Sequence, residues 1–204
     1  MRSFTSVFIL LILAGCATPR AVTPREYLDE TTAATVTVAA DPWIYSEKRA
    51  RPGSTLTDYR PAAVGTLPGE TVPESRDFLS VYAIDVNRMG SHRQYLAVLQ
   101  SLPRVGTPGA EGSAPTLELR VAGQTLSLQP ITQTPRELGI AQAPAQEAMR
   151  GSQWWYFPVD KDVLTAIGGT RDLQAALLVN GERTAYDIWR DGSAELAELT
   201  SVLP

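Results

Sequence analysis

Alternating apolar residues on either side of short turns are the feature that most constrains how this chain can fold. The segment 116–129 carries a turn signal, Ala122-Gly123, at its centre. A two-residue turn there places four leucines on one face and polar residues on the other, as a half-buried antiparallel hairpin requires. The predicted cross-strand pairs are Leu117 with Leu128 and Leu119 with Leu126.

Two further hairpins are predicted. Asn180-Gly181 is a stronger turn signal, because both residues readily adopt the positive φ angles of a two-residue hairpin turn. The runs Phe78 to Val86 and Arg93 to Leu102, joined by residues 87–92, form the other hairpin, and their two apolar faces place them centrally in a sheet. The pairs predicted around Asn180-Gly181 are Leu177 with Thr184, Ala175 with Tyr186, and Leu173 with Ile188, with Leu178 and Trp189 on the other face.

The chain before these hairpins combines a helix signal with a strand signal. Thr23-Pro24-Arg25-Glu26 has a capping threonine, a proline at the first helical position and a glutamate three residues after the cap, so it predicts a short helix. Thr31 to Val38 is dominated by β-branched residues and predicts a strand. We expect that strand to continue after Asp41-Pro42, from Trp43 to Tyr45.

The second half of the chain adds an aromatic strand and two helices. Trp154 to Val159 predicts a strand that runs into a helix capped by Asp160 and ended by Gly168-Gly169. Ser193 is predicted to cap a last helix. The predicted buried positions are Val163, Leu164 and Ile167 in the first helix, and Leu196, Leu199 and Leu203 in the second.

These elements predict an all-β, mainly antiparallel fold with short peripheral helices, in one domain over residues 23–204. A single immunoglobulin-like β-sandwich is the first expectation, and a partly closed β-barrel is the alternative. Ser46 to Asp77 is rich in proline, glycine, serine and charge, which predicts a long loop that is loose rather than functional. Pro103 to Pro115 is interpreted as a linker.

The N-terminal segment has the pattern of an export signal. Met1-Arg2 is a short basic start, and the apolar run Phe4 to Ala14 is about half the roughly 20 residues that cross a bilayer. The run ends in Leu13-Ala14-Gly15-Cys16, which resembles the lipobox of bacterial lipoproteins. This resemblance implies a signal peptide over residues 1–15, cleavage between Gly15 and Cys16, and lipid attached to Cys16.

The same resemblance implies a location. Ala17 is not the aspartate associated with inner-membrane retention, so we expect the periplasmic side of the outer membrane, with the inner membrane and the cell surface as alternatives. Residues 16–22 are the lipidated N-terminus and a short tether. The tether, Ala17 to Val22, reaches about 20 Å at most, which keeps the domain near its implied partner, the lipid bilayer. The mature chain also resembles uncharacterised Gram-negative lipoproteins, a likeness that implies no activity. It lies in Arg25 to Asp29, Thr32 to Thr37 and Tyr186 to Gly192.

Composition excludes several classes of chemistry. Cys16 is the only cysteine, so we expect no disulfide and no thiolate chemistry in the folded part. The net charge is -4 and the basic residues are scattered, so we expect no nucleic-acid partner. Lys48, Arg49 and Arg51 are interpreted as a solvated loop. There is no P-loop, dinucleotide-binding glycine pattern or G-x-S-x-G motif, and no metal or cofactor is expected beyond the lipid on Cys16.

Candidate functional residues are few. His92, the only histidine, is expected to be solvated in a hairpin turn. Trp154, Trp155 and Tyr156 form the candidate binding surface for an envelope protein or a glycan, with burial in the core as the alternative. We therefore expect a non-catalytic binding or structural module. The alternative is an enzyme acting on cell wall or polysaccharide through a carboxylate pair: Asp29 with Glu30, Asp160 with Asp162, or Asp187 with Asp191.

Overall fold

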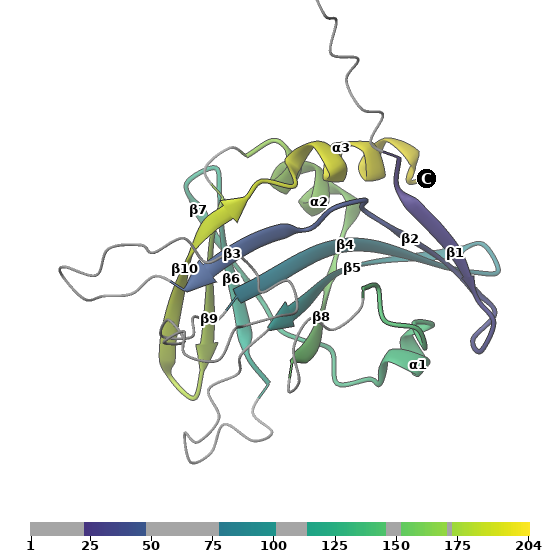
Figure 1. Cartoon of the computed structure of the whole chain (residues 1–204), viewed down its shortest axis with the longest axis horizontal. Coiled ribbons are helices and arrows are strands. Elements are labelled where there is room, and N and C mark those ends of the chain that lie inside the picture. Colours follow the sequence, from purple (N-terminus) through teal and green to yellow (C-terminus); the bar gives the residue numbers. More distant parts are fainter. Residues whose placement is uncertain (1–22, 48–77, 101–113, 146–151, 171–172) are drawn as a thin grey trace, which may run out of the picture.

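The computed structural model describes residues 23–47, 78–100, 114–145, 152–170 and 173–204 (Figure 1). Within these ranges the chain forms one sheet of ten strands, whose pairs are all antiparallel, and three short helices. In chain order the elements are β1 (Arg25–Asp29), β2 (Ala34–Val38), β3 (Trp43–Glu47), β4 (Phe78–Arg88), β5 (Ser91–Gln100), β6 (Thr116–Val121), β7 (Gln124–Leu128), α1 (Pro135–Leu138), β8 (Gln153–Val159), α2 (Lys161–Gly168), β9 (Gln174–Val179), β10 (Glu182–Arg190) and α3 (Ser193–Val202).

β4 is the centre of the sheet because three strands pair with it. β5 runs along one edge of β4, and β2 and β3 follow one another along the other edge. Val38 of β2 lies opposite Ile84, and Trp43 of β3 lies opposite Val81, so residues 39–42 interrupt what is otherwise one long strand. The predicted continuation of the strand beyond this break is confirmed.

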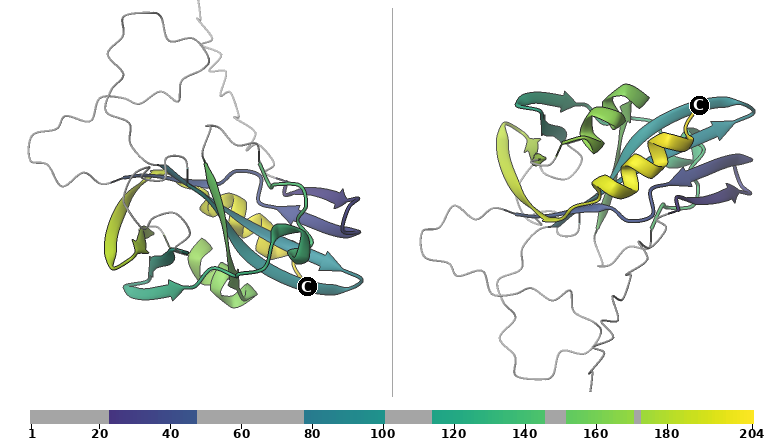
Figure 2. Two further views of the ribbon diagram at one scale, coloured as in Figure 1. Left: turned by 90° about the horizontal axis from the view of Figure 1, so that it is seen from below. Right: turned by 90° about the horizontal axis from the view of Figure 1, so that it is seen from above.

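The sheet curls so that its two arms face each other. One arm runs from β4 through β3, β10, β9 and β6 to β7, and the other runs through β5 to β8. Figure 2 shows β9 and β10 turned over beside the long β4–β5 hairpin. Side chains of both arms meet in one buried cluster, which we call the larger core. The predicted all-β, mainly antiparallel and sandwich-like fold is therefore confirmed, whereas its strand order was not predicted.

α2 and α3 cover one side of the larger core (Figure 1). As predicted, α2 follows Asp160, and Leu164 and Ile167 are buried while Val163 is partly buried. Leu196, Leu199 and Leu203 are buried too, and Leu203 lies just beyond the end of α3. One cap is corrected: Gly192 is the N-cap of α3, and Ser193 is its first residue, whose backbone N–H donates to Asp191 Oδ1 at 2.9 Å.

A smaller core lies on the opposite face of β2, β4, β5 and β8. The segment after β7 covers it with α1, whose N-cap Thr134 and Glu137 form a reciprocal capping box. Leu138 and Ile140 are buried in this core, and Gly139 between them has a φ of 92°. The segment from α1 to Ile140 therefore closes this side of the sheet.

The three predicted hairpins are all present. The turns Ala122-Gly123 and Asn180-Gly181 have positive φ at both residues, and so does Met89-Gly90, which joins β4 to β5. The register of the β6–β7 hairpin is as predicted. Leu177 pairs with Thr184 and Ala175 with Tyr186 as predicted. The predicted pair of Leu173 with Ile188 is wrong, because β9 begins only at Gln174 and its ladder with β10 ends at Ala175 and Tyr186.

The helix predicted at Thr23-Pro24-Arg25-Glu26 is wrong. β1 takes up Arg25–Asp29 and pairs along its whole length with β2. A helix of one or two turns is only marginally stable alone, so strand pairing outweighs its capping signal. The strand predicted from Thr31 is also corrected, since residues 31–33 belong to the turn and β2 begins at Ala34.

The loop predicted over Ser46 to Asp77 begins later than expected, because β3 includes Ser46, which is buried. The rest of that loop from residue 48 and most of the linker Pro103 to Pro115 lie outside the described residues, as do the predicted signal peptide 1–15 and tether 16–22. In the described part of the chain, no helix has the length and apolar character needed to cross a bilayer.

Candidate functional site

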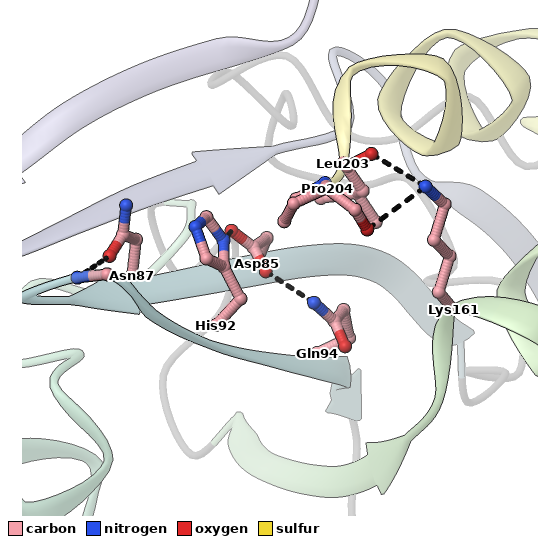
Figure 3. Close-up of polar contacts among 8 residues, drawn as sticks. Asp85, Asn87, His92, Gln94, Lys161, Leu203 and Pro204 are labelled. Atoms are coloured by element: carbon pink, nitrogen blue, oxygen red, sulfur yellow. Dashed lines mark hydrogen bonds and ion pairs between the residues drawn. The ribbon is translucent and has the colours of Figure 1, made fainter.

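A buried carboxylate lies on the face of β4 that also carries the larger core. Asp85 is 2% exposed, and both of its oxygens accept hydrogen bonds from β5 (Figure 3). Oδ2 is 2.8 Å from His92 Nδ1, and Oδ1 is 2.7 Å from Gln94 Nε2. Gln94 lies directly opposite Asp85, and His92 is two residues along the same face of β5. Since a buried carboxylate is costly without hydrogen bonds, these three side chains act as one unit, the Asp85 cluster.

The Asp85 cluster fixes how two polar groups are presented. A carboxylate accepts hydrogen bonds and does not donate them, so Nδ1 of His92 carries a proton and Nε2 is the ring nitrogen left for a ligand. In the same way, the amide nitrogen of Gln94 faces Asp85 and its carbonyl oxygen is turned away. His92 has 28% of its side chain exposed, and both His92 and Gln94 line an open cavity. Asp85 is not part of the described lining, so it orients these two side chains without facing the cavity itself.

The cavity has a volume of about 460 Å³ and lies where the two ends of the curled sheet approach each other. Leu128 at the end of β7 and Val159 at the end of β8 line it, and Asp160 contributes from the start of α2. His92 and Gln94 of β5 supply further polar groups. Ligand pockets in proteins have volumes of roughly 300–1,000 Å³ and combine apolar walls with a few polar groups, so this cavity has the size and composition of a binding site.

The expectation that His92 is solvated in a hairpin turn is wrong. The turn is Met89-Gly90, and His92 lies in β5 with a buried carboxylate as its partner. The missed signal was Asp85, a charged residue inside an otherwise apolar central strand. Such a residue requires a polar partner on a neighbouring strand, and the β4–β5 register supplies one.

The aromatic residues of the candidate binding surface lie partly in the two cores. Trp154 and Trp155 are partly buried, and Tyr156 is buried. The Trp154 ring stacks on that of Tyr156, with centroids 6.2 Å apart, and packs on the smaller core, whereas Trp155 packs on the larger one. Neither indole N–H has a hydrogen-bond acceptor among the described residues. Their role as a binding surface stays a prediction.

The acidic residues predicted as carboxylate pairs have separate surroundings. Asp29 is buried at the turn between β1 and β2, and Asp191 accepts hydrogen bonds from Ser193 beside α3. Asp160 alone among the six predicted acids lines the described cavity, so none of the three pairs has both carboxylates there.

An imidazole oriented by a carboxylate is the arrangement of a general base, which in hydrolytic triads acts on a neighbouring nucleophile. In the described part of the cavity, no serine, threonine or cysteine is present as a nucleophile. Across the described ranges, no three His, Cys, Asp or Glu side chains gather closely enough to hold a metal ion.

The chain end after α3 is fixed on the same side of β4 and β5 as the Asp85 cluster (Figure 3). Lys161, the first residue of α2, donates from Nζ to the carbonyl oxygens of Leu203 and Pro204 at 2.6 and 3.1 Å. The contact joins the start of α2, which borders the cavity through Asp160, to the end of α3. It therefore stabilises one wall of the cavity.

The chain matches no protein-family model, no curated protein and no solved structure in comparisons with all three.

The proton position on His92 can be measured directly, because it is the only histidine in the chain. At a pH where the ring is neutral, we expect long-range ¹H–¹⁵N NMR spectra to show the proton on Nδ1. Asp85→Asn replaces a carboxylate that only accepts by an amide that can also donate to Nδ1, so the form protonated on Nε2 should appear in that variant. A wild-type ring protonated mainly on Nε2 would contradict the arrangement described here.

Proposed function

We propose that this chain is a lipid-anchored protein of the bacterial cell envelope, in which the β-domain is a non-catalytic binding or structural module on the periplasmic side of the outer membrane. The observation that carries the proposal is Leu13-Ala14-Gly15-Cys16, placed at the end of a short apolar run. The sole cysteine of the chain thus stands seven residues before Thr23, where the described part of the structure begins.

Acylation at Cys16 supports lasting membrane attachment. Each buried CH₂ contributes about 0.8 kcal/mol, so one acyl chain binds a bilayer only marginally, whereas the several chains of a bacterial lipoprotein hold firmly. Ala17 to Val22 limit the distance between the lipidated cysteine and the domain to about 20 Å. The molecules that the domain meets are then those close to the membrane surface.

The cavity and the Asp85 cluster support a binding role for the domain. The cavity combines oriented polar groups with apolar side chains, which is the usual composition of a ligand site. A β-fold by itself implies no chemistry, so the role is argued from this site. Ala17 after the cysteine supports the outer membrane as the location, by the resemblance described above.

Cys16→Ser is expected to abolish incorporation of radiolabelled or alkyne-tagged palmitate, because serine has no thiol to receive the diacylglycerol group. Labelling is measured in a bacterial expression host, after immunoprecipitation of the full chain. Persistent labelling of Cys16→Ser would remove the lipid-anchor proposal.

Ala17→Asp is the matched control, because it changes the neighbouring residue and keeps the cysteine. It should be labelled like the wild type, but it should move from the outer-membrane to the inner-membrane fraction on a sucrose gradient. Equal distribution of wild type and Ala17→Asp would contradict the proposed outer-membrane location while leaving the lipid anchor in place.

A further inference from the structure

Three polar side chains that line the cavity have fixed positions: His92, Gln94 and Asp160. Hydrogen bonds to Asp85 orient His92 and Gln94, and Asp160 adds a carboxylate from the N-cap of α2. An aspartate at an N-cap usually accepts a hydrogen bond from the first turn of its helix, but Asp160 makes no such bond. The position predicted for Asp160 is confirmed, and its carboxylate is not used to cap the helix.

These groups require a partner that both donates and accepts hydrogen bonds. His92 Nε2 accepts a hydrogen bond when the ring is neutral and donates one when it is protonated, whereas the Asp160 carboxylate only accepts. Arg93 and Gln133, which are exposed and also line the cavity, bring donors. A hydroxyl group donates and accepts at one atom, so it can satisfy each of these side chains.

Much of the remaining lining is apolar, including Leu128, Ile131 and Val163. These three side chains are partly buried and pack against the two cores, so they offer a supported apolar surface. A ligand that fits the whole cavity therefore combines hydroxyl groups with apolar C–H surface. Sugar rings have this combination.

Other ligand classes fit the lining less well. In its described lining, the cavity has one cationic side chain, Arg93, and one anionic side chain, Asp160, so these two charges together favour neither an anion nor a cation over a neutral ligand. A wholly apolar molecule would leave the hydrogen-bonding groups of His92 and Gln94 without water or partner, which is unfavourable.

We infer that the cavity between β5, β7, β8 and α2 binds a neutral mono- or disaccharide, with His92, Gln94 and Asp160 as the residues that contact its hydroxyl groups and Asp85 as a positioning residue. The inference rests on the proposed binding role of the domain and gives that role a ligand class. It does not depend on lipid attachment at Cys16.

The test uses the full lipidated chain in a detergent without a sugar headgroup. The probes are N,N′-diacetylchitobiose, cellobiose and maltose at millimolar concentration, and binding is measured by saturation-transfer-difference NMR and titration. At least one probe should bind, and His92→Ala and Asp160→Asn should each weaken its affinity. His92→Ala should do so by about tenfold, the effect of losing one hydrogen bond to a partly buried polar group. Asp160→Asn should have a smaller effect, because Asp160 is exposed and asparagine keeps one acceptor oxygen.

Gln174→Ala is the matched control, because this exposed glutamine on β9 lies outside the cavity. The affinity of the Gln174→Ala variant for the sugar should equal that of the wild type. Asp85→Asn should weaken binding and shift the His92 proton in the same sample, which distinguishes positioning from a loss of folding. Failure of all three probes to bind, or affinity unchanged in both His92→Ala and Asp160→Asn, would overturn the inference. Palmitate labelling at Cys16 is unaffected by either result, so the lipid anchor is judged separately.

Discussion

Gly139→Ala is expected to destabilise the domain by about 2–5 kcal/mol, the sum of a backbone and a packing effect. Gly139 has a φ of 92°, in a left-handed region that costs other residues roughly 1–2 kcal/mol. An added Cβ would lie 2.9 Å from Cγ1 of Val86 and 3.1 Å from Cβ of Ala34. Both neighbours are buried in the smaller core, and overpacking of this kind costs about 1–3 kcal/mol.

Urea unfolding followed by tryptophan fluorescence measures the loss, and Gly123→Ala is its matched control. Gly123 has a similar φ of 82°, but nothing lies within 4 Å of an added Cβ. The control should lose only the backbone cost of about 1–2 kcal/mol. Equal losses in the two variants would show that the segment after α1 does not pack as tightly on β2 and β4 as the structure indicates.

The hairpins could be predicted because their information is local. Ala122-Gly123 and Asn180-Gly181 specify both the turn and the register, and the alternation of apolar residues beside them must agree with that register. The prediction failed at the far end of the β9–β10 hairpin. β9 begins only at Gln174, so Leu173 lies outside its ladder with β10, whereas β10 continues to Ile188 by pairing with β3 on its other edge.

One tetrapeptide shows how tertiary pairing overrides a local signal. Thr-Pro-Arg-Glu occurs at residues 23–26 and again at residues 134–137. The second copy starts α1 with a complete capping box, whereas the first enters β1. β1 has β2 beside it to complete its hydrogen bonds, and Tyr27 packs on the smaller core, so the environment decides between two conformations open to the same residues.

The candidate site depends on contacts that no short segment of sequence contains. The cavity forms where β7 and β8, the two ends of the sheet, come near each other, and the strand order that brings them there was not predicted. The pairing of His92 with Asp85 depends on the register of the β4–β5 hairpin. That hairpin was predicted, but its connection was predicted to span all of residues 87–92, which left His92 outside the strand. The aromatic strand was predicted correctly, but sequence could not determine how far its side chains are buried.

Asp29 also makes contacts with residues distant in sequence. Asp29→Ala is expected to lower the free energy of unfolding by about 3 kcal/mol. Asp29 is 2% exposed, and its Oδ1 accepts hydrogen bonds from the backbone N–H groups of Thr31 and Thr32 at 3.0 and 3.1 Å. Its Oδ2 accepts the N–H of Gln142 at 2.9 Å, which joins the β1–β2 hairpin to the segment after α1. Leaving a buried donor without a partner costs about 1–3 kcal/mol, and Asp29→Ala leaves three N–H donors without their acceptor. Partial relaxation of the turn keeps the total loss near the cost of one such donor.

The stabilisation by Asp29 should depend on pH. Burial acts to raise the pKa of the Asp29 carboxyl, but hydrogen bonds from the backbone of Gln142, Thr32 and Ala141 outweigh it, so the pKa lies below its ordinary value. A carboxyl with a lower pKa in the folded state stabilises fully above its unfolded pKa of about 3.9. That contribution is lost as the pH falls from about the unfolded pKa through the folded pKa.

Urea unfolding between neutral pH and about pH 3 measures this contribution. Asp29→Asn should be less stable than the wild type at neutral pH, and the difference should shrink on acidification, because the protonated wild type loses the same charge. Glu26→Gln is the control: Glu26 is an exposed carboxylate on the same strand, so its removal tests the effect of charge alone and should leave the acid profile close to that of the wild type. A constant difference between Asp29→Asn and the wild type at all pH values would mean that the Asp29 carboxylate does not hold the two segments together through its charge.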